Sequence, residues 1–250
     1  PDDAIVVGDV YAGWENPDTY DERLVANQWY YSDTTVSSAY TVLPFRDYVT
    51  DLCADLRGST CANALGTLLA ADPTTGEEVS ALLGVNTIVI IKASFPDGVP
   101  APSSGWSVAR DGDHTQILVR DEPVDTAGGV AWTSAGTAVE VIEQTDAELR
   151  LRVESIGPDA RAVLSRLAWP GYTADGASFA AETRGYLLTL DLADVQPGDI
   201  VTVQFRPPGW WAEIGCLVVA VIALVGWPIS TAVRRRAARR ACSSAGSDAA

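Results

Sequence analysis

The spacing of apolar residues changes twice along the chain and divides the sequence into three parts. In residues 1–105 the apolar positions follow helical spacing in some segments and form continuous runs in others. In residues 106–208 they recur at every second position, which is typical of strands with one buried face. Residues 214–229 hold no charged side chain. The pattern therefore predicts an α+β protein with a mixed α/β part, an antiparallel β-sandwich-like domain and one apolar C-terminal helix.

The first part is predicted to contain three helices and two buried strands. Apolar residues at helical intervals indicate helices over residues 45–56 and 61–70, and a third helix between residues 75 and 84. Residues 85–91 are almost continuously apolar and β-branched, as expected for a strand that is buried on both faces. Residues 4–8 form a shorter run of the same kind.

The clearest strands of the second part are predicted at residues 115–120, 148–154, 186–192 and 201–205. Gly-Pro, Asp-Gly and Pro-Gly pairs mark turns between them. Several short strands at this spacing indicate a sandwich or a curled sheet. The side chains predicted to share buried faces are Leu149, Leu151, Val153, Tyr186, Leu188, Leu190, Leu192, Val201, Val203 and Phe205.

The apolar C-terminal stretch is predicted to be a transmembrane helix over residues 209–233. A helix needs about 20 apolar residues to cross a bilayer. Tryptophan favours the headgroup level, and clustered arginine marks the cytoplasmic side of a span. The alternative is a helix buried in the core of a soluble protein. The residues predicted to anchor the span are Trp210, Trp211, Trp227, Arg234, Arg235 and Arg236.

This orientation predicts four segments in a bacterial cell membrane. We expect residues 1–105 to be a mixed α/β extracytoplasmic region and residues 106–208 an antiparallel β domain. The span at 209–233 then precedes a basic, disordered cytoplasmic tail at 234–250. Residues 1 to about 209 would lie outside the cell. The sequence has no methionine, so we expect it to be part of a longer protein or to have lost a signal peptide.

The net charge limits the kinds of binding partner, and the positions of the cysteines indicate a possible disulfide. The formal net charge is −16, which leaves no basic face for nucleic acid. Cys53 and Cys61 lie between two predicted helices, on the side expected to be oxidising. They form either a disulfide or two buried thiols.

Sequence motifs for catalysis are scarce. Neither a nucleotide-binding glycine loop nor a GxSxG nucleophile motif occurs. Asp111-Gly112-Asp113 is similar to a metal-binding DxD motif, but its place between two strand-like segments favours a hairpin turn. His114 is the only histidine. We therefore predict no metal, no cofactor and no catalytic residue in this chain.

Aromatic residues are the strongest candidates for binding a ligand. Trp29, Tyr30 and Tyr31 form one group, and Trp169 and Tyr172 form a second. Such rings stack against the apolar face of a sugar, or they pack in a core or at a sheet edge. Both interpretations stay open for each group.

Three segments together resemble the C-terminal part of the YfhO family of multi-spanning bacterial membrane proteins. Residues 82–90 (LLGVNTIVI) resemble a strand of that family, with Thr87 in place of the usual aromatic residue. Residues 162–176 (AVLSRLAWPGYTADG) are similar to its "YPGW" strand and hairpin, with the aromatics exchanged. Residues 198–208 (GDIVTVQFRPP), followed by an apolar helix, are similar to its last strand and final span.

The resemblance implies a GT-C-like glycosyltransferase that transfers sugar from a polyprenyl-phosphate donor to cell-envelope glycans. Catalysis in such proteins lies near the N-terminal membrane helices, so no catalytic residue carries over to this chain. The implied partners are the lipid bilayer, upstream transmembrane helices of the same protein, and the polyprenyl-phosphate sugar or envelope glycan. The alternative is a single-span membrane-anchored ectodomain that binds glycan or a protein partner without catalysis.

Overall fold

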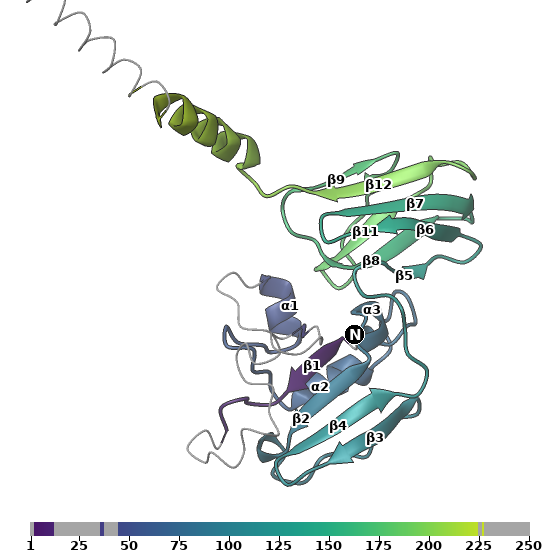
Figure 1. Cartoon of the computed structure of the whole chain (residues 1–250). Coiled ribbons are helices and arrows are strands. Elements are labelled where there is room, and N and C mark those ends of the chain that lie inside the picture. Colours follow the sequence, from purple (N-terminus) through teal and green to yellow (C-terminus); the bar gives the residue numbers. More distant parts are fainter. Residues whose placement is uncertain (1–2, 13–35, 38–44, 225–226, 228–250) are drawn as a thin grey trace, which may run out of the picture. The chain divides into compact units, whose positions relative to one another are not determined.

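The computed structural model describes residues 3–12, 36–37, 45–224 and 227 (Figure 1). The chain divides into two compact units, Pro1–Phe205 and Arg206–Ala250. The described part of the first unit holds three four-stranded sheets. The fold is therefore mostly β, and the predicted α+β class is wrong. Strands that are far apart in the sequence pair with one another to form these sheets, as described below.

The first sheet has the order β1-β2-β4-β3. Its strands are β1 (Ala4–Val7), β2 (Thr87–Ile91), β3 (Trp106–Asp111) and β4 (Thr115–Arg120). β1 and β2 are parallel, whereas β4 pairs antiparallel with both β2 and β3. We expected β3 and β4 in the second part of the chain, but every residue of β2 has a partner in β4. The local period of two carries no information about which sheet a strand joins.

The helices are shorter than the sequence predicted. They are α1 (Arg46–Asp51), α2 (Asn63–Leu69), α3 (Val79–Leu82) and the 3-10 turn η3 (Lys92–Ser94). α1 ends because Cys53 has a φ of 40°, in the left-handed region that a helix cannot include. Leu56, predicted to lie on the apolar face of this helix, is 50% exposed.

The first sheet is buried on both faces at β1 and β2. One face of these strands, with Ile5 and Ile88, packs in a cluster with the apolar side chains of α1, α2 and α3. The opposite face, with Val6 and Val89, packs in a second cluster that includes Val36. The continuous apolar runs in the sequence are thus explained, and the prediction of two buried strands is confirmed.

The other two sheets have the orders β10-β11-β8-β5 and β6-β7-β12-β9. Side chains from β7 and β12 in one sheet and from β8 and β11 in the other form a single apolar cluster. The two sheets therefore enclose one core. Their strands are β5 (Val130–Thr133), β6 (Ala138–Gln144), β7 (Glu148–Ser155), β8 (Arg161–Leu167), β9 (Tyr172–Asp175), β10 (Ser178–Phe179), β11 (Leu187–Asp191) and β12 (Ile200–Phe205).

Most of the predicted alternation is present in this core. Leu149, Leu151 and Val153 of β7 are fully buried, as are Val201 and Val203 of β12. The exception is at β11. Tyr186 was predicted to share a face with Leu188, but it lies in the core cluster of the first sheet instead. The register between β11 and β8 shifts at Leu187 and Thr189, and this irregularity interrupts the alternation.

The second unit begins with a helix over residues 210–224 of the described chain. Among the described residues, no helix has the length and apolar character needed to cross a membrane. The described residues therefore contradict the predicted fold class that includes a transmembrane helix over residues 209–233. Trp210, Trp211 and Trp227 are 43%, 70% and 75% exposed. Arg234, Arg235 and Arg236 lie outside the described residues.

Candidate functional site

Trp169 and Tyr172 line one cleft in the first unit. The cleft has a volume of about 650 Å³. Its walls come from the start of β1, the segment before β5, the β6–β7 turn and the β8–β9 connection. Asp125, Gln144 and Asp146 contribute polar side chains to the same walls. The two aromatic residues are thus brought together beside groups that accept hydrogen bonds.

Trp169 is half-buried at the end of β8. Its backbone N–H donates to the Leu167 carbonyl at 2.8 Å, which turns the chain out of the strand. The indole meets Phe45 edge to face, with ring centroids 5.2 Å apart and an angle of 81°. Trp169 therefore both packs against Phe45 and lines the cleft.

Tyr172 begins β9 and is also half-buried. It stands opposite Phe205 of β12 in the strand register. The two rings lie 4.9 Å apart at an angle of 48°, and Tyr172 packs against the sandwich core. The core thus fixes the position of the ring while part of it borders the cleft.

Arg166 holds the walls of the cleft together. Its side chain donates three hydrogen bonds to backbone carbonyls: Nε to Gly128 at 2.6 Å, Nη1 to Asp146 at 3.0 Å and Nη2 to Thr145 at 2.6 Å. The residue is only 9% exposed. A buried guanidinium needs such partners, because an unpaired charge in the interior is costly. We infer that Arg166 positions the cleft. The sequence analysis missed this role, because nothing in the local pattern distinguishes Arg166 from Arg161 of the same strand.

Two glycines allow the segment before β5 to approach the rest of the cleft. Gln144 donates from Nε2 to the Ala127 carbonyl at 2.8 Å. A Cβ on Gly129 would lie 2.7 Å from Oε1 of this glutamine. Gly84, at a φ of +70°, follows α3, and a Cβ there would lie 2.6 Å from the Cα of Ala127. A larger side chain at Gly84 would displace the wall, whereas one at Gly129 would have to move the end of the Gln144 side chain.

A second polar cluster joins α1 to the turn before β11. Arg184 donates from Nη2 and Nε to the Asp51 carboxylate at 2.6 to 2.8 Å, and from Nη1 to Asp72 at 3.3 Å. The Tyr186 hydroxyl donates to Asp51 at 2.8 Å and accepts from Arg184 Nε at 3.0 Å. Asp72 is 2% exposed, so the cluster is largely shielded from water. Every polar group has a charged or hydrogen-bonding partner, which favours a structural role.

Burial and pairing shift the pKa values in this cluster. Burial, the largest influence, disfavours the charged form of Arg184, but hydrogen bonding to Asp51 and interaction with Tyr186 together raise its pKa above the ordinary value. Burial, followed by the hydrogen bond to Asp51, raises the pKa of Tyr186. Burial likewise raises the pKa of Tyr48, whose ring meets Tyr186 edge to face at 5.4 Å. These groups therefore keep their ordinary protonation states at neutral pH.

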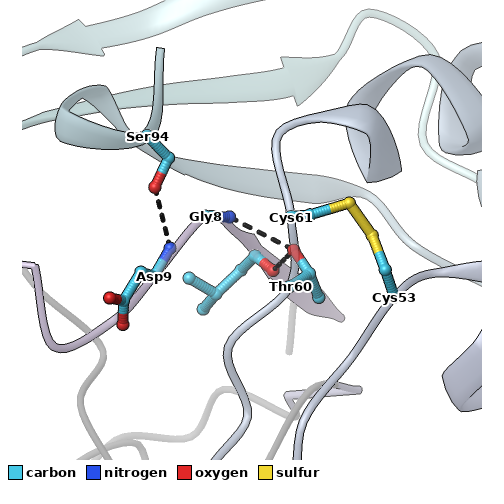
Figure 2. The surroundings of a disulfide bond; sticks show 7 residues. Gly8, Asp9, Cys53, Thr60, Cys61 and Ser94 are labelled. Atoms are coloured by element: carbon cyan, nitrogen blue, oxygen red, sulfur yellow. Dashed lines mark hydrogen bonds between the residues drawn. A yellow bond between two sulfur atoms is a disulfide. The ribbon is translucent and has the colours of Figure 1, made fainter. Parts of the chain in front are cut away.

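A disulfide joins Cys53 and Cys61, with Cα atoms 5.7 Å apart. Figure 2 shows how the loop that it closes reaches the end of β1. The Thr60 hydroxyl accepts from the Gly8 N–H and donates to the Val6 carbonyl, both at 3.1 Å. Ser94, at the end of η3, accepts from the Asp9 N–H at 2.8 Å (Figure 2). The disulfide therefore fixes a segment that completes the hydrogen bonding of β1.

The structure shows the surroundings of the Asp111-Gly112-Asp113 segment, whereas the aromatic group at residues 29–31 lies outside the described chain. Asp111 ends β3 and forms an ion pair with Lys92 at 2.7 Å, and the N–H of Gly112 bonds to the Thr115 carbonyl at 2.9 Å. These contacts confirm the hairpin turn. The hydrogen bond from Lys92 lowers the pKa of Asp111. Within the described ranges, no group of histidine, cysteine and acidic residues is arranged to hold a metal ion. Trp29, Tyr30 and Tyr31 lie outside the described residues.

Comparison with known proteins does not assign this chain to a family. No family model, no curated protein and no solved structure matches the chain. The function is therefore inferred from the residues of the chain itself.

Proposed function

We propose that this chain is an extracytoplasmic domain of the bacterial cell envelope that binds glycan in the cleft lined by Trp169 and Tyr172. The observation that carries the proposal is the placement of both rings in one cleft of about 650 Å³. Ligand sites commonly have volumes of about 300–1,000 Å³ and combine aromatic walls with a few polar groups. A sugar ring fits this chemistry, because its C–H face is apolar and its hydroxyls are donors.

The polar groups of the cleft favour a hydroxylated ligand over an anionic one. Asp125 and Asp146 are exposed carboxylates on its walls, and carboxylates accept hydrogen bonds from hydroxyls. The guanidinium of Arg166 is directed to three backbone carbonyls, so its donors serve the walls. The net charge of −16 also disfavours phosphorylated or uronic-acid ligands.

The disulfide supports the extracytoplasmic location. Disulfides persist in oxidising compartments and are rare in the cytosol. Cys53 is exposed, so a reducing environment would have access to the bond. An exported domain is consistent with this chemistry.

The proposal is tested by isothermal titration of the full chain with arabinan, galactan and mannan oligosaccharides. We expect saturable binding of at least one, with a Kd of about 0.1–1 mM. Trp169→Ala should weaken it about tenfold or more, because a stacking surface is lost. Trp211→Ala, which removes an exposed tryptophan from the second unit, is the matched control. Absence of binding to all oligosaccharides, or equal affinity for the Trp169 variant, would contradict the proposal.

A second candidate is that this domain belongs to a GT-C-like glycosyltransferase, as the YfhO resemblance implies. It is favoured by one observation: residues 172–175 and 202–205, from two of the resembling segments, pair antiparallel as β9 and β12. In that case the cleft would hold the acceptor glycan while catalysis occurs elsewhere in a longer protein. The test is sugar transfer by the complete gene product from a polyprenyl-phosphate-sugar donor. Loss of transfer in Trp169→Ala supports this role, and no transfer by the unaltered protein contradicts it.

A further inference from the structure

A second cavity, of about 710 Å³, lies between α2 and the loop that follows η3. Its volume falls within the range of about 300–1,000 Å³ that small-molecule sites occupy. Its lining is mainly apolar, with Asn63 and Thr67 as the polar side chains. We call it the α2 groove; its main apolar lining residues are Leu65, Leu69, Phe95, Pro100, Pro102 and Leu118.

The absence of charge distinguishes the α2 groove from most of this molecule. None of its lining residues is charged, although the sequence contains 33 acidic and 17 basic residues. A charged ligand group in the groove would lose hydration without gaining an ionic partner, and this is unfavourable. The part of a ligand that lies here is therefore uncharged.

The backbone of the groove disfavours a peptide as the occupant. Pro100 and Pro102 have no N–H, and the N–H of Phe95 already bonds to the Lys92 carbonyl at 2.9 Å. The amides inside α2 belong to a helix, in which N–H groups bond to carbonyls one turn earlier. An extended peptide would bury its own N–H and C=O groups with few partners here. A hydrocarbon chain has no such groups and loses nothing on burial.

Gly66 opens the wall formed by α2. A Cβ built at this position would have no atom within 4 Å, so the space beside it is free. Leu69 and Phe95, which are partly exposed, also line the groove. A methylene chain would gain dispersion contacts and lose its hydration along such a surface.

We propose that the α2 groove binds the acyl chain of a lipid. This site involves none of the residues of the glycan cleft, so it does not rest on the proposed function. The headgroup would remain outside the groove, in solvent.

The test is photolabelling of the full chain with palmitic acid that carries a diazirine in its chain, followed by mapping of the label by mass spectrometry. We expect label in residues 62–70 and 95–102, and unlabelled palmitate should compete with it. Gly66→Leu fills the groove and should reduce this labelling at least tenfold, while the thermal midpoint stays equal or rises because leucine favours helix. Gly215→Leu adds the same side chain at another glycine with free space and should change nothing at the groove.

Three results would overturn the proposal. The first is label confined to the exposed apolar helix over residues 210–224, and the second is no label at all. The third is groove labelling that Gly66→Leu leaves unchanged. A parallel labelling experiment with an apolar peptide that carries photo-leucine tests the alternative that the groove binds a peptide. If the peptide labels the groove and palmitate gives the second result, the groove binds a peptide instead.

Discussion

Arg184 and Asp51 are 133 residues apart in the sequence, yet Nη2 of Arg184 donates to both carboxylate oxygens of Asp51, at 2.7 and 2.6 Å. Arg184 has a φ of 57°, and Gly185 follows with a φ of 74°. Two successive positive φ angles are characteristic of a type I′ turn, and arginine is strained there. The ion pair offsets this strain, so the turn before β11 and the end of α1 stabilise each other.

Replacement of Arg184 should therefore destabilise the fold strongly. Arg184→Leu leaves the partly buried Asp51 and the almost fully buried Asp72 without their cation, which we expect to lower the free energy of unfolding by about 3 kcal/mol. Urea denaturation followed by circular dichroism measures this loss. The matched control is Arg152→Leu, which breaks the exposed pair with Glu140 and should cost less than about 1 kcal/mol. Equal losses in the two variants would exclude a special role for the buried pair.

Removal of the disulfide should loosen the loop that supports β1. The double variant Cys53→Ser/Cys61→Ser loses a cross-link over a short loop, for which we expect a cost of about 2–3 kcal/mol. The thermal midpoint of the unaltered protein should fall in a thiol reductant, whereas the midpoint of the variant should not respond. Hydrogen exchange should also increase at Gly8, whose N–H bonds to Thr60. An unaltered protein that is insensitive to the reductant would contradict this account.

Stability should decrease at alkaline pH because of Tyr48 and Tyr186. Both pKa values are raised above the reference of 10.0, mainly by burial. Above pH 10 the unfolded chain releases these protons while the folded chain retains them, so unfolding becomes easier. The stabilising contribution is complete below pH 10. It declines above that pH by about 1.4 kcal/mol per pH unit for each tyrosine.

The control for this pH dependence is Tyr186→Phe. Because it removes one of the two titrating groups, the loss of unfolding free energy between about pH 10 and about pH 11 should shrink by about half of the tyrosine contribution. Urea unfolding at both pH values measures the difference. If the variant loses as much stability as the unaltered protein over this interval, Tyr186 is not the group responsible.

Two glycines should respond in opposite directions to alanine. Gly84→Ala places a Cβ 2.6 Å from the backbone of Ala127 at a φ of +70°, so we expect a loss of about 2 kcal/mol. Gly66→Ala lies within α2 with no neighbouring atom in reach, so it should stabilise the protein by about 0.5–1 kcal/mol. Thermal unfolding of both variants distinguishes them. A neutral Gly84→Ala would show that the wall near Ala127 adjusts freely.

The local pattern predicted the strands better than their pairing. Leu149, Leu151 and Val153 alternate in the sequence, and all three are buried in the sandwich core, because side-chain direction in a strand depends only on the period of two. The partnership of β2 with β4 depends on contacts between separate segments that both have apolar character. No short window of sequence contains that information.

The residues that organise the sites were harder to predict, because their roles depend on distant partners. Arg166 and Arg184 are ordinary in local sequence, and only the fold shows that one bonds to three carbonyls and the other to Asp51. Trp169 and Tyr172 were predictable as a pair because only two residues lie between them in the sequence. Tyr186 was assigned to the wrong core, since the irregularity between Leu187 and Thr189 leaves no mark in the pattern.

NMR of the tryptophan indole N–H groups shows whether a sugar ring lies against Trp169 and Tyr172. The resonance of Trp169 is assigned by its absence in Trp169→Phe, and that of Trp211 by its absence in Trp211→Phe. During titration with the oligosaccharide that binds most tightly, we predict a saturable shift of the Trp169 resonance and none of the Trp211 resonance. A Trp169 signal that stays fixed while the oligosaccharide binds elsewhere would contradict the account.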